Sequence, residues 1–246
     1  MTHASCLGHR ADHLLIGSAI NLAAGARHFA KQVTVAWLVA LAPIGLGLAG
    51  ELTLTVTDRF GHPVVDVVAT AAPATSKVAD PAAGHAAATM DQKNLAFVPQ
   101  VLVVAVGTQV EFPNTDSVSH QVYSFSLAKR FQLPLYKGAT HPPVIFDKAG
   151  LVVLGCNIHD QMVGYIYVTD APLYGKTDSQ GALHLTNVPT GDYVATLWSP
   201  FIADAPSTLT RTVHVGEHEP TSLRLQLIRD LRARPEPKPR RADWDY

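Results

Sequence analysis

One stretch of the sequence constrains the fold more than any other, because it places three metal-binding side chains between two apolar segments. Cys156, His159 and Met162 follow one another at three-residue intervals. The apolar segments 151–154 and 164–168 flank them and are typical of short strands. A tight loop between two such strands can direct all three side chains toward one point. The sequence therefore predicts a β-protein organised around this loop.

A second histidine extends the set of metal-binding groups. His120 lies at the end of another apolar segment, and a single strand could not supply all four side chains. Two imidazoles, one thiolate and one thioether are the ligands of a type I copper site, in which the methionine is a weak axial ligand. We therefore predict a copper site formed by His120, Cys156, His159 and Met162. Zinc could occupy such a site, but the soft axial sulfur favours copper.

The composition favours strands and excludes one class of partner. Hydrophobic residues make up 47% of the chain and charged residues only 16%, so a sizeable core can form, and 17 glycines and 17 prolines supply turns. Alternating segments such as 52–57, 193–198 and 222–227 predict an all-β protein. The formal net charge of −1 gives no reason to expect a nucleic-acid partner.

The N-terminal region has the features of an export signal. Residues 1–50 contain basic side chains followed by the apolar segment 33–48, and small residues precede a predicted cleavage site after Ala49. This segment is shorter than the ~20 residues that span a bilayer, so we expect cleavage, periplasmic localisation and no stable membrane insertion. The exported part would keep one cysteine, Cys156, which cannot form an internal disulfide.

Residues 86–170 resemble the cupredoxin family, in particular plastocyanin and amicyanin, and the short ligand loop is most similar to that of amicyanin. The matching motifs are Phe97-x-Pro99, Val106-Gly107-x-x-Val110-x-Phe112-x-Asn114, His120, Phe146-x-x-Ala149-Gly150 and Cys156-x-x-His159-x-x-Met162. The resemblance implies a Greek-key β-sandwich with these same four residues as type I copper ligands. It also implies that Asn114 joins the two ligand-bearing loops by hydrogen bonds. Finally, it implies transient docking to a periplasmic dehydrogenase or cytochrome.

Several positions differ from the pattern of that family, among them Leu154 and Gly155, which stand where an aromatic-rich strand is common. Asp160 follows the second histidine, where amicyanin-like loops carry proline, and its charge is expected to favour Cu(II) and lower the reduction potential. Gln121 stands where asparagine is usual. Asp116 and Asp160 are expected to be solvated or to lie behind the ligands, and not to be catalytic.

The flanking segments share a turn motif. Thr57-Asp58-x-x-Gly61 and Thr177-Asp178-x-x-Gly181 have the same residue types at the same spacing. Residues 51–80 and 171–228 resemble a carboxypeptidase-regulatory-like, or transthyretin-like, β-sandwich. We predict that the cupredoxin-like region is inserted into this split sandwich. The alternative is two domains in series, with 51–80 as an extra hairpin. The charged, proline-rich tail 229–246 is predicted to be disordered.

These predictions lead to three hypotheses about function. The first is an exported type I copper protein that carries single electrons and is not an enzyme, since a closed set of four ligands leaves no open position for substrate. The second is a copper-binding or copper-buffering protein without electron transfer. The third is an interaction module with a structural metal. The remaining histidines of residues 51–246 are expected to be ordinary surface or structural residues, namely His62, His85, His141, His184, His214 and His218.

Overall fold

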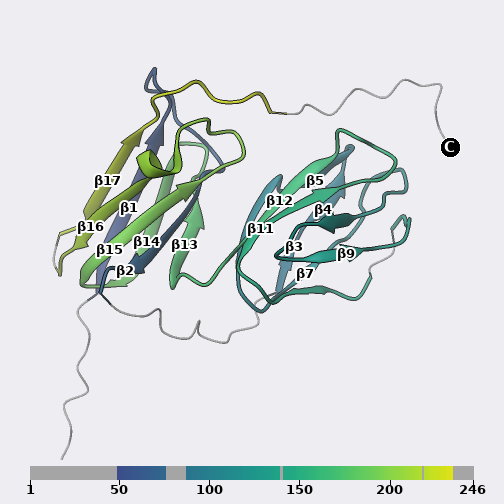
Figure 1. Ribbon diagram of the computed structural model, residues 1–246, viewed down its shortest axis with the longest axis horizontal. Helices are drawn as coiled ribbons and strands as arrows, with labels where there is room; N and C mark the ends of the chain where they lie inside the picture. The colour runs from purple at the N-terminus through teal and green to yellow at the C-terminus, as the bar shows by residue number, and fades with distance from the viewer. Residues whose placement is uncertain (1–48, 76–86, 139–140, 218, 235–246) are drawn as a thin grey trace, which may run out of the picture. The chain divides into compact units, whose positions relative to one another are not determined.

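The computed structural model describes residues 49–75, 87–138, 141–217 and 219–234 (Figure 1), and this part of the chain is all-β, as predicted. Residues 1–48, which contain most of the predicted export signal, lie outside the described residues. No helix among the described residues is long and apolar enough to cross a membrane. The elements are β1 (Ala49–Thr57), β2 (Val68–Pro73), β3 (Ala87–Thr89), β4 (Asp91–Lys93), β5 (Ala96–Val98), β6 (Val101–Ala105), β7 (Thr108–Glu111), β8 (Tyr123–Phe125), β9 (Arg130–Gln132), β10 (Val144–Phe146), β11 (Gly150–Gly155), β12 (Val163–Thr169), β13 (Leu173–Lys176), β14 (Ala182–Pro189), β15 (Gly191–Trp198), the 3₁₀ helix η1 (Pro206–Leu209), β16 (Thr210–Val215) and β17 (Thr221–Gln226).

Strands β3 to β12 form a β-sandwich that we call the inserted sandwich. One sheet has the order β10-β7-β3, the other has the order β6-β12-β11-β8-β9, and β4 and β5 form a separate hairpin. Strands β11 and β12, which flank the predicted ligand loop, pair antiparallel from Gly150↔Val168 to Gly155↔Val163. This register places the Cys156 loop at one end of the sandwich, directly after the last paired residues.

The alternating pattern of β12 explains how the inserted sandwich forms its core. Gly164, Ile166 and Val168 are buried, whereas the tyrosines between them are only partly buried. Since successive side chains of a strand point to opposite faces, one face of β12 packs into the core. A side chain at Gly164 would come within 2.8 Å of the Phe97 Cβ, so this position leaves room only for glycine. Cys156 and Met162 belong to the same buried core cluster.

Strands β1, β2 and β13 to β17 form a second sandwich, which we call the split sandwich. Its sheets have the orders β14-β1-β17 and β13-β2-β15-β16. Figure 1 shows the blue strands β1 and β2 among the green and yellow strands that end the chain. Leu54 of β1, Leu197 of β15 and Leu225 of β17 share one buried cluster. Strands from both sides of the inserted sandwich therefore build one core.

The repeated turn motif adopts the same hydrogen-bonded structure at both places. The Asp58 Oδ1 accepts the backbone N–H groups of Phe60 and His62 at 2.8 and 2.9 Å. The Asp178 Oδ1 accepts those of Gln180 and Ala182 at 2.8 and 2.9 Å. Such a local carboxylate-to-backbone pattern is the reason aspartate is favoured in turns. The sequence similarity of the two segments thus corresponds to identical turn chemistry.

Replacing Asp178 by asparagine should make the stability of the protein less sensitive to acid. Hydrogen bonds from the backbone N–H groups of Ala182 and Gln180 hold the pKa of Asp178 below its usual value. This stabilisation is present above the unfolded pKa of about 3.9 and is lost as the pH falls through the lower folded pKa. Urea unfolding at a series of acidic pH values should therefore show a shallower loss for Asp178→Asn than for the parent. An unchanged slope would contradict the carboxylate's role.

The C-terminal tail begins with residues that contact the split sandwich. The Arg232 N–H donates to the Phe201 carbonyl at 2.7 Å, and the Arg234 guanidinium lies 3.1 Å from the Asp66 carboxylate. Disorder was predicted from residue 229, whereas residues 229–234 are placed by contacts of this kind. The remaining tail, 235–246, lies outside the described residues.

Candidate metal centre

Three of the four predicted ligands meet at one end of the inserted sandwich. His120 comes from the connection between β7 and β8, whereas Cys156 and His159 come from the loop between β11 and β12. The two Nδ1 atoms of His120 and His159 are 3.1 Å apart. The Cys156 Sγ lies 3.8 Å from the His120 Nδ1 and 3.6 Å from the His159 Nδ1. Within the described residues, no other group of three His, Cys, Asp or Glu side chains has metal-binding spacing.

The two nitrogen–sulfur distances fit a single metal ion held by two nitrogens and one sulfur. Metal–nitrogen bonds of about 2.0 Å and metal–sulfur bonds of about 2.3 Å, at roughly 120° to one another, place nitrogen and sulfur about 3.7 Å apart. The observed nitrogen–sulfur distances of 3.6 and 3.8 Å bracket that value. The donor set of one thiolate and two imidazoles suits copper, so the residues present fit this metal.

Met162 closes the ligand loop and is buried beside it. Its backbone N–H donates to the His159 carbonyl at 2.9 Å, which makes the loop a tight turn. The side chain is only 1% exposed and packs in the core cluster that contains Cys156. The position of Met162 is therefore set by the loop and by the core. Its role as the axial ligand stays a prediction.

His120 is held in place by a backbone contact with a segment that is distant in sequence. The His120 N–H donates to the Tyr136 carbonyl at 2.9 Å, and the Tyr136 N–H donates to the His120 carbonyl at 3.0 Å. The Tyr136 hydroxyl donates in turn to the Phe112 carbonyl and accepts a hydrogen bond from the buried amide of Gln92. Because His120, Tyr136 and Gln92 are all buried, these bonds fix the backbone that carries the first ligand.

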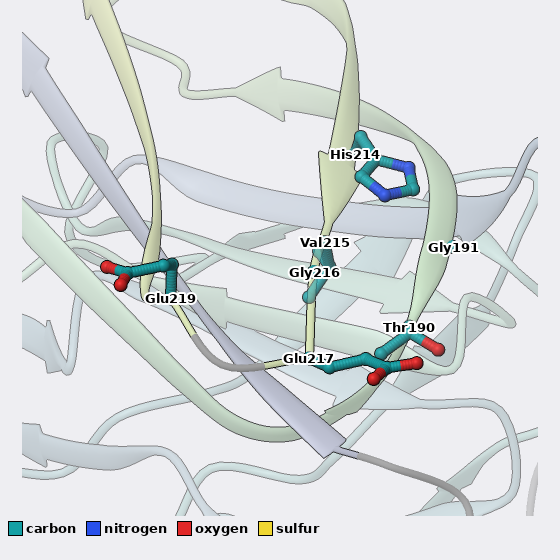
Figure 2. A pocket seen from close by; sticks show the side chains of 7 residues that line it. All are labelled: Thr190, Gly191, His214, Val215, Gly216, Glu217 and Glu219. Atoms are coloured by element: carbon teal, nitrogen blue, oxygen red, sulfur yellow. The ribbon is translucent and has the colours of Figure 1, made fainter.

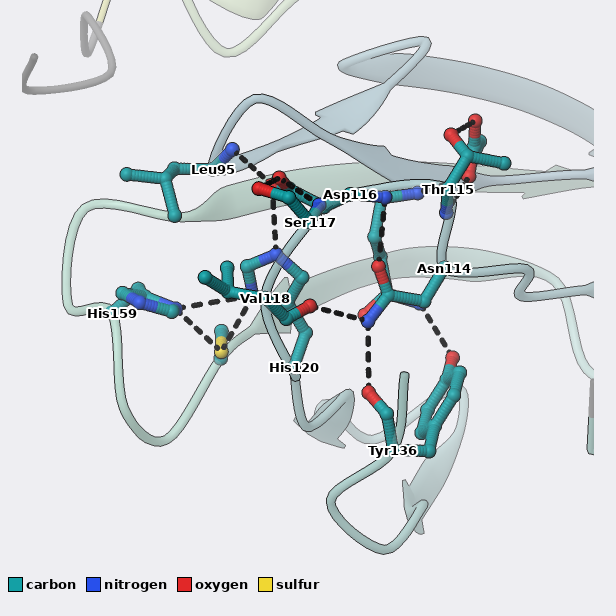
Figure 3. Close-up of polar contacts among 12 residues, drawn as sticks. Leu95, Asn114, Thr115, Asp116, Ser117, Val118, His120, Tyr136 and His159 are labelled. Atoms are coloured by element: carbon teal, nitrogen blue, oxygen red, sulfur yellow. Dashed lines mark hydrogen bonds and ion pairs between the residues drawn. The ribbon is translucent and has the colours of Figure 1, made fainter. Parts of the chain in front are cut away.

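Asn114 contributes to the same side of the site (Figure 3). Its Nδ2 donates to the Val118 carbonyl at 3.0 Å and to the Tyr136 carbonyl at 2.8 Å, while its Oδ1 accepts the Asp116 N–H at 3.0 Å. The resemblance implied that Asn114 joins the two ligand-bearing loops. The hydrogen bonds above shape the connection that leads to His120, and a bond from Asn114 to the Cys156 loop stays a prediction.

Electrostatic interactions favour a thiolate and a charged imidazole at the site. Burial alone would raise the pKa of Cys156, but hydrogen bonds from His120 and from the backbone N–H groups of Gln121 and Ile158 bring that pKa below its usual value. Burial would lower the pKa of His120, but its contacts with Cys156 and Asp116 raise that pKa. A thiolate is the form of cysteine that binds metal. Cys156 is therefore prepared for metal binding.

The most direct partner of a ligand is the carboxylate of Asp116, which lies behind His120, one of the two places that the sequence suggested for it. Its Oδ2 lies 3.0 Å from the His120 Nε2, and its side chain is only 5% exposed (Figure 3). The prediction left open whether Asp116 is solvated or lies behind the ligands, and did not name His120 as its partner. The four-residue spacing from Asp116 to His120 was the available signal. Nothing local in the sequence pointed to Tyr136, because its contact with His120 depends on chain folding.

The loop that carries His159 forms the solvent-facing side of the site. His159 and Val163 are partly buried, Ile158 is 52% exposed, and Asp160 is exposed as predicted for a solvated group. The loop that includes the predicted ligand His159 would therefore separate a bound metal from solvent.

The described histidines outside the site make separate contacts. His62 pairs with Asp58 at 3.0 Å, His184 bonds to the Thr53 hydroxyl at 3.0 Å, and His214 pairs with Asp192 at 2.8 Å. Figure 2 shows a hollow of the split sandwich that His214 lines with Glu217 and Glu219, and in this view the His214 ring lies apart from both carboxylates. His85 and His218 lie outside the described residues. No second metal-binding group forms among the described histidines.

Comparison with protein-family models and with curated protein sequences finds no match. Among solved structures, the chain is similar to a purple cupredoxin from Nitrosopumilus maritimus, with 26% identity over 33% of this chain and 99% of that chain and a TM-score of 0.31. A mutant of amicyanin in its reduced state is 22% identical over 41% of this chain and 99% of that chain, with a TM-score of 0.31. A Cu-containing nitrite reductase from Thermus scotoductus SA-01 is 24% identical over 46% of this chain and 28% of that chain, with a TM-score of 0.32. What the site can bind is therefore inferred from its own side chains.

Proposed function

We propose that the protein binds one type I copper ion and carries single electrons. The observation that carries this proposal is the meeting of His120, Cys156 and His159, with their Nδ1 and Sγ atoms 3.1 to 3.8 Å apart. Met162, buried at the end of the same loop, is the proposed axial ligand. Copper bound by such a donor set supplies reversible one-electron chemistry.

The fold supports electron transfer because two separate segments, each fixed by backbone hydrogen bonds, hold the ligands. Cys156 follows the paired strand β11, and His120 is bonded through its backbone to Tyr136. Ligands held in this way move little when the charge of the metal changes, which keeps the energetic cost of each transfer low. A site closed by four protein ligands leaves no open position for substrate, so we propose a carrier and not an enzyme.

We further propose that electrons pass through the edge of the site formed by His159. This ring is partly buried, and the exposed side chain of Ile158 and the partly buried Val163 provide an apolar rim beside it. Transient redox partners dock over small areas, which suits such a surface. The proposed partner is a periplasmic dehydrogenase or cytochrome, and its support is the resemblance of residues 86–170 to amicyanin.

We also propose that the protein is exported after cleavage following Ala49. The support is the basic and apolar pattern of the first 50 residues. Mass spectrometry of protein purified from the periplasm should give a chain that begins at Gly50. An intact chain beginning at Met1 in the cytoplasm would contradict this proposal.

Titration of the purified protein with Cu(II) tests the proposed site. We expect an intense thiolate-to-copper absorption band in the visible range that saturates at one equivalent. Reversible voltammetry with rapid electron exchange would support a carrier, whereas copper binding without reversible exchange would support copper buffering. The absence of the visible band would contradict a type I site and favour an interaction module.

A further inference from the structure

A single buried carboxylate connects the first predicted ligand to two other parts of the inserted sandwich. The Asp116 Oδ2 lies 3.0 Å from the His120 Nε2 and accepts the Leu95 N–H at 2.8 Å. The Asp116 Oδ1 accepts the N–H of Ser117 at 2.6 Å. The side chains of His120 and Asp116 are 0% and 5% exposed (Figure 3). The carboxylate is thus shielded from water, where a charge interacts more strongly with its neighbours.

The contact with Asp116 determines which nitrogen of His120 can bind a metal. An ionised carboxylate can only accept hydrogen bonds, so the His120 Nε2 must carry a proton in this contact. In a neutral imidazole the other nitrogen, Nδ1, then keeps its lone pair. That Nδ1 is the atom that lies 3.1 Å from the His159 Nδ1 and 3.8 Å from the Cys156 Sγ. The carboxylate therefore selects the tautomer that the metal centre requires.

The hairpin formed by β4 and β5 donates a backbone hydrogen bond to the same carboxylate oxygen that contacts His120. Its turn residues Asn94 and Leu95 both have positive φ angles, of 52° and 59°. A left-handed backbone costs a residue with a side chain roughly 1–2 kcal/mol, and apart from glycine only asparagine and aspartate adopt it at times. In Leu95 this conformation directs the backbone N–H to the Asp116 Oδ2. A buried hydrogen bond to a charged group can offset that cost.

We propose that Asp116 is a positioning residue of the metal centre, which holds His120 as an Nδ1 ligand and favours Cu(II) over Cu(I) through its negative charge. This inference rests on the proposed copper function. The negative charge acts through the imidazole, since a hydrogen-bonded carboxylate makes a ligating histidine more basic. A more basic ligand stabilises the higher oxidation state of the metal, so the carboxylate lowers the reduction potential.

Two variants of the full chain separate the charge of Asp116 from its hydrogen bond. Asp116→Asn keeps an oxygen that can accept the Nε2–H but loses the charge. We expect it to retain the visible copper band and to bind Cu(II) about 10- to 100-fold more weakly. If Cu(I) affinity stays the same, that loss raises the reduction potential by about 59 to 118 mV. Asp116→Ala removes both functions and should also change the position or the width of the visible band.

Asp91→Asn is the matched control, because Asp91 bonds to the same connecting segment without touching a ligand. The Asp91 carboxylate accepts the Thr115 hydroxyl at 2.6 Å and the Thr115 N–H at 3.2 Å. A change that acts only through the shape of the segment would affect both variants alike. We expect the potential of Asp91→Asn to stay at the parent value. Equal shifts in Asp91→Asn and Asp116→Asn would overturn the proposal.

A measurement on the metal-free protein tests the tautomer directly and does not depend on copper. In ¹⁵N NMR of the parent at alkaline pH, the His120 Nε2 should carry a slowly exchanging proton and Nδ1 should carry none. The opposite tautomer in the parent would overturn the proposal even if a variant fails to fold.

The same measurements separate the positioning role from the copper function. If the parent carries the proton on Nε2 but gives no visible copper band, the copper function fails and the positioning role remains. If the parent has the band and Asp116→Asn keeps the parent affinity and potential, the positioning role fails.

Discussion

Replacing Cys156 by serine is expected to abolish the visible copper band completely while leaving the fold largely intact. The band requires a sulfur-to-copper bond, and Cys156 is the single thiol at the site, 3.6 and 3.8 Å from the two ligand nitrogens. Its pKa is lowered by hydrogen bonds that a serine hydroxyl cannot convert into a comparable anion. The substitution changes one buried atom and should cost only about 1 kcal/mol of stability. Absorption spectra after Cu(II) addition, together with urea unfolding curves, measure both effects.

The chain offers a matched control for this experiment. Cys6 is the only other cysteine of the sequence, and it lies outside the described residues. In the uncleaved chain, which still carries Cys6, Cys6→Ser should keep the full intensity of the band. If Cys156→Ser retained the band, the assignment of the thiolate ligand would be wrong, and so would the electron-carrier proposal built on it.

Replacing Gly181 by alanine is expected to destabilise the split sandwich strongly. Gly181 has a φ of +67°, and an added Cβ would lie 2.5 Å from the Val56 carbonyl oxygen and 3.0 Å from the Val64 nitrogen. The left-handed conformation costs roughly 1–2 kcal/mol, and forcing a methyl group against a fixed backbone costs a further 1–3 kcal/mol or so. The backbone cannot easily move, since the Val56 N–H donates to the Gly181 carbonyl at 2.8 Å. We therefore expect a loss of about 2–5 kcal/mol in urea unfolding.

Gly61 provides the comparison, because it occupies the same position in the sister turn. Its φ is +90°, but an added Cβ would meet no atom within 4 Å. Gly61→Ala should therefore show only the conformational cost, about 1–2 kcal/mol. Equal losses of unfolding free energy in the two variants would contradict this prediction. They would mean that the close approach of the Gly181 turn to β1 adds nothing to the cost of the substitution.

The longer strands of the fold could be predicted from the sequence, whereas the shortest strands could not. The alternation of residues 52–57 and 222–227 predicted two strands that the structure contains as β1 and β17. The short strands β3 (Ala87–Thr89) and β4 (Asp91–Lys93) have no such pattern and were not predicted. Three-residue strands carry too few alternating positions to show a period, so their pairing depends on neighbours that are distant in the chain.

The spacing of Cys156, His159 and Met162 is local information, and together with His120 it predicted a metal site. A donor set and its order along the chain follow directly from the residue types. A single sequence also specified the turn chemistry of Asp58 and Asp178, because those hydrogen bonds join residues two and four positions apart. Interactions of this range are encoded in the segment itself.

Only the tertiary structure decided that His120 reaches Cys156 across 36 positions, and that the buried Asp116 carboxylate selects the nitrogen His120 presents. It also decided that Asn114 shapes the His120 side of the site and that Tyr136 fixes the backbone there. The physical reason is that these contacts depend on burial and on strand register. Both arise only when distant segments pack together, so no local pattern of residues contains them.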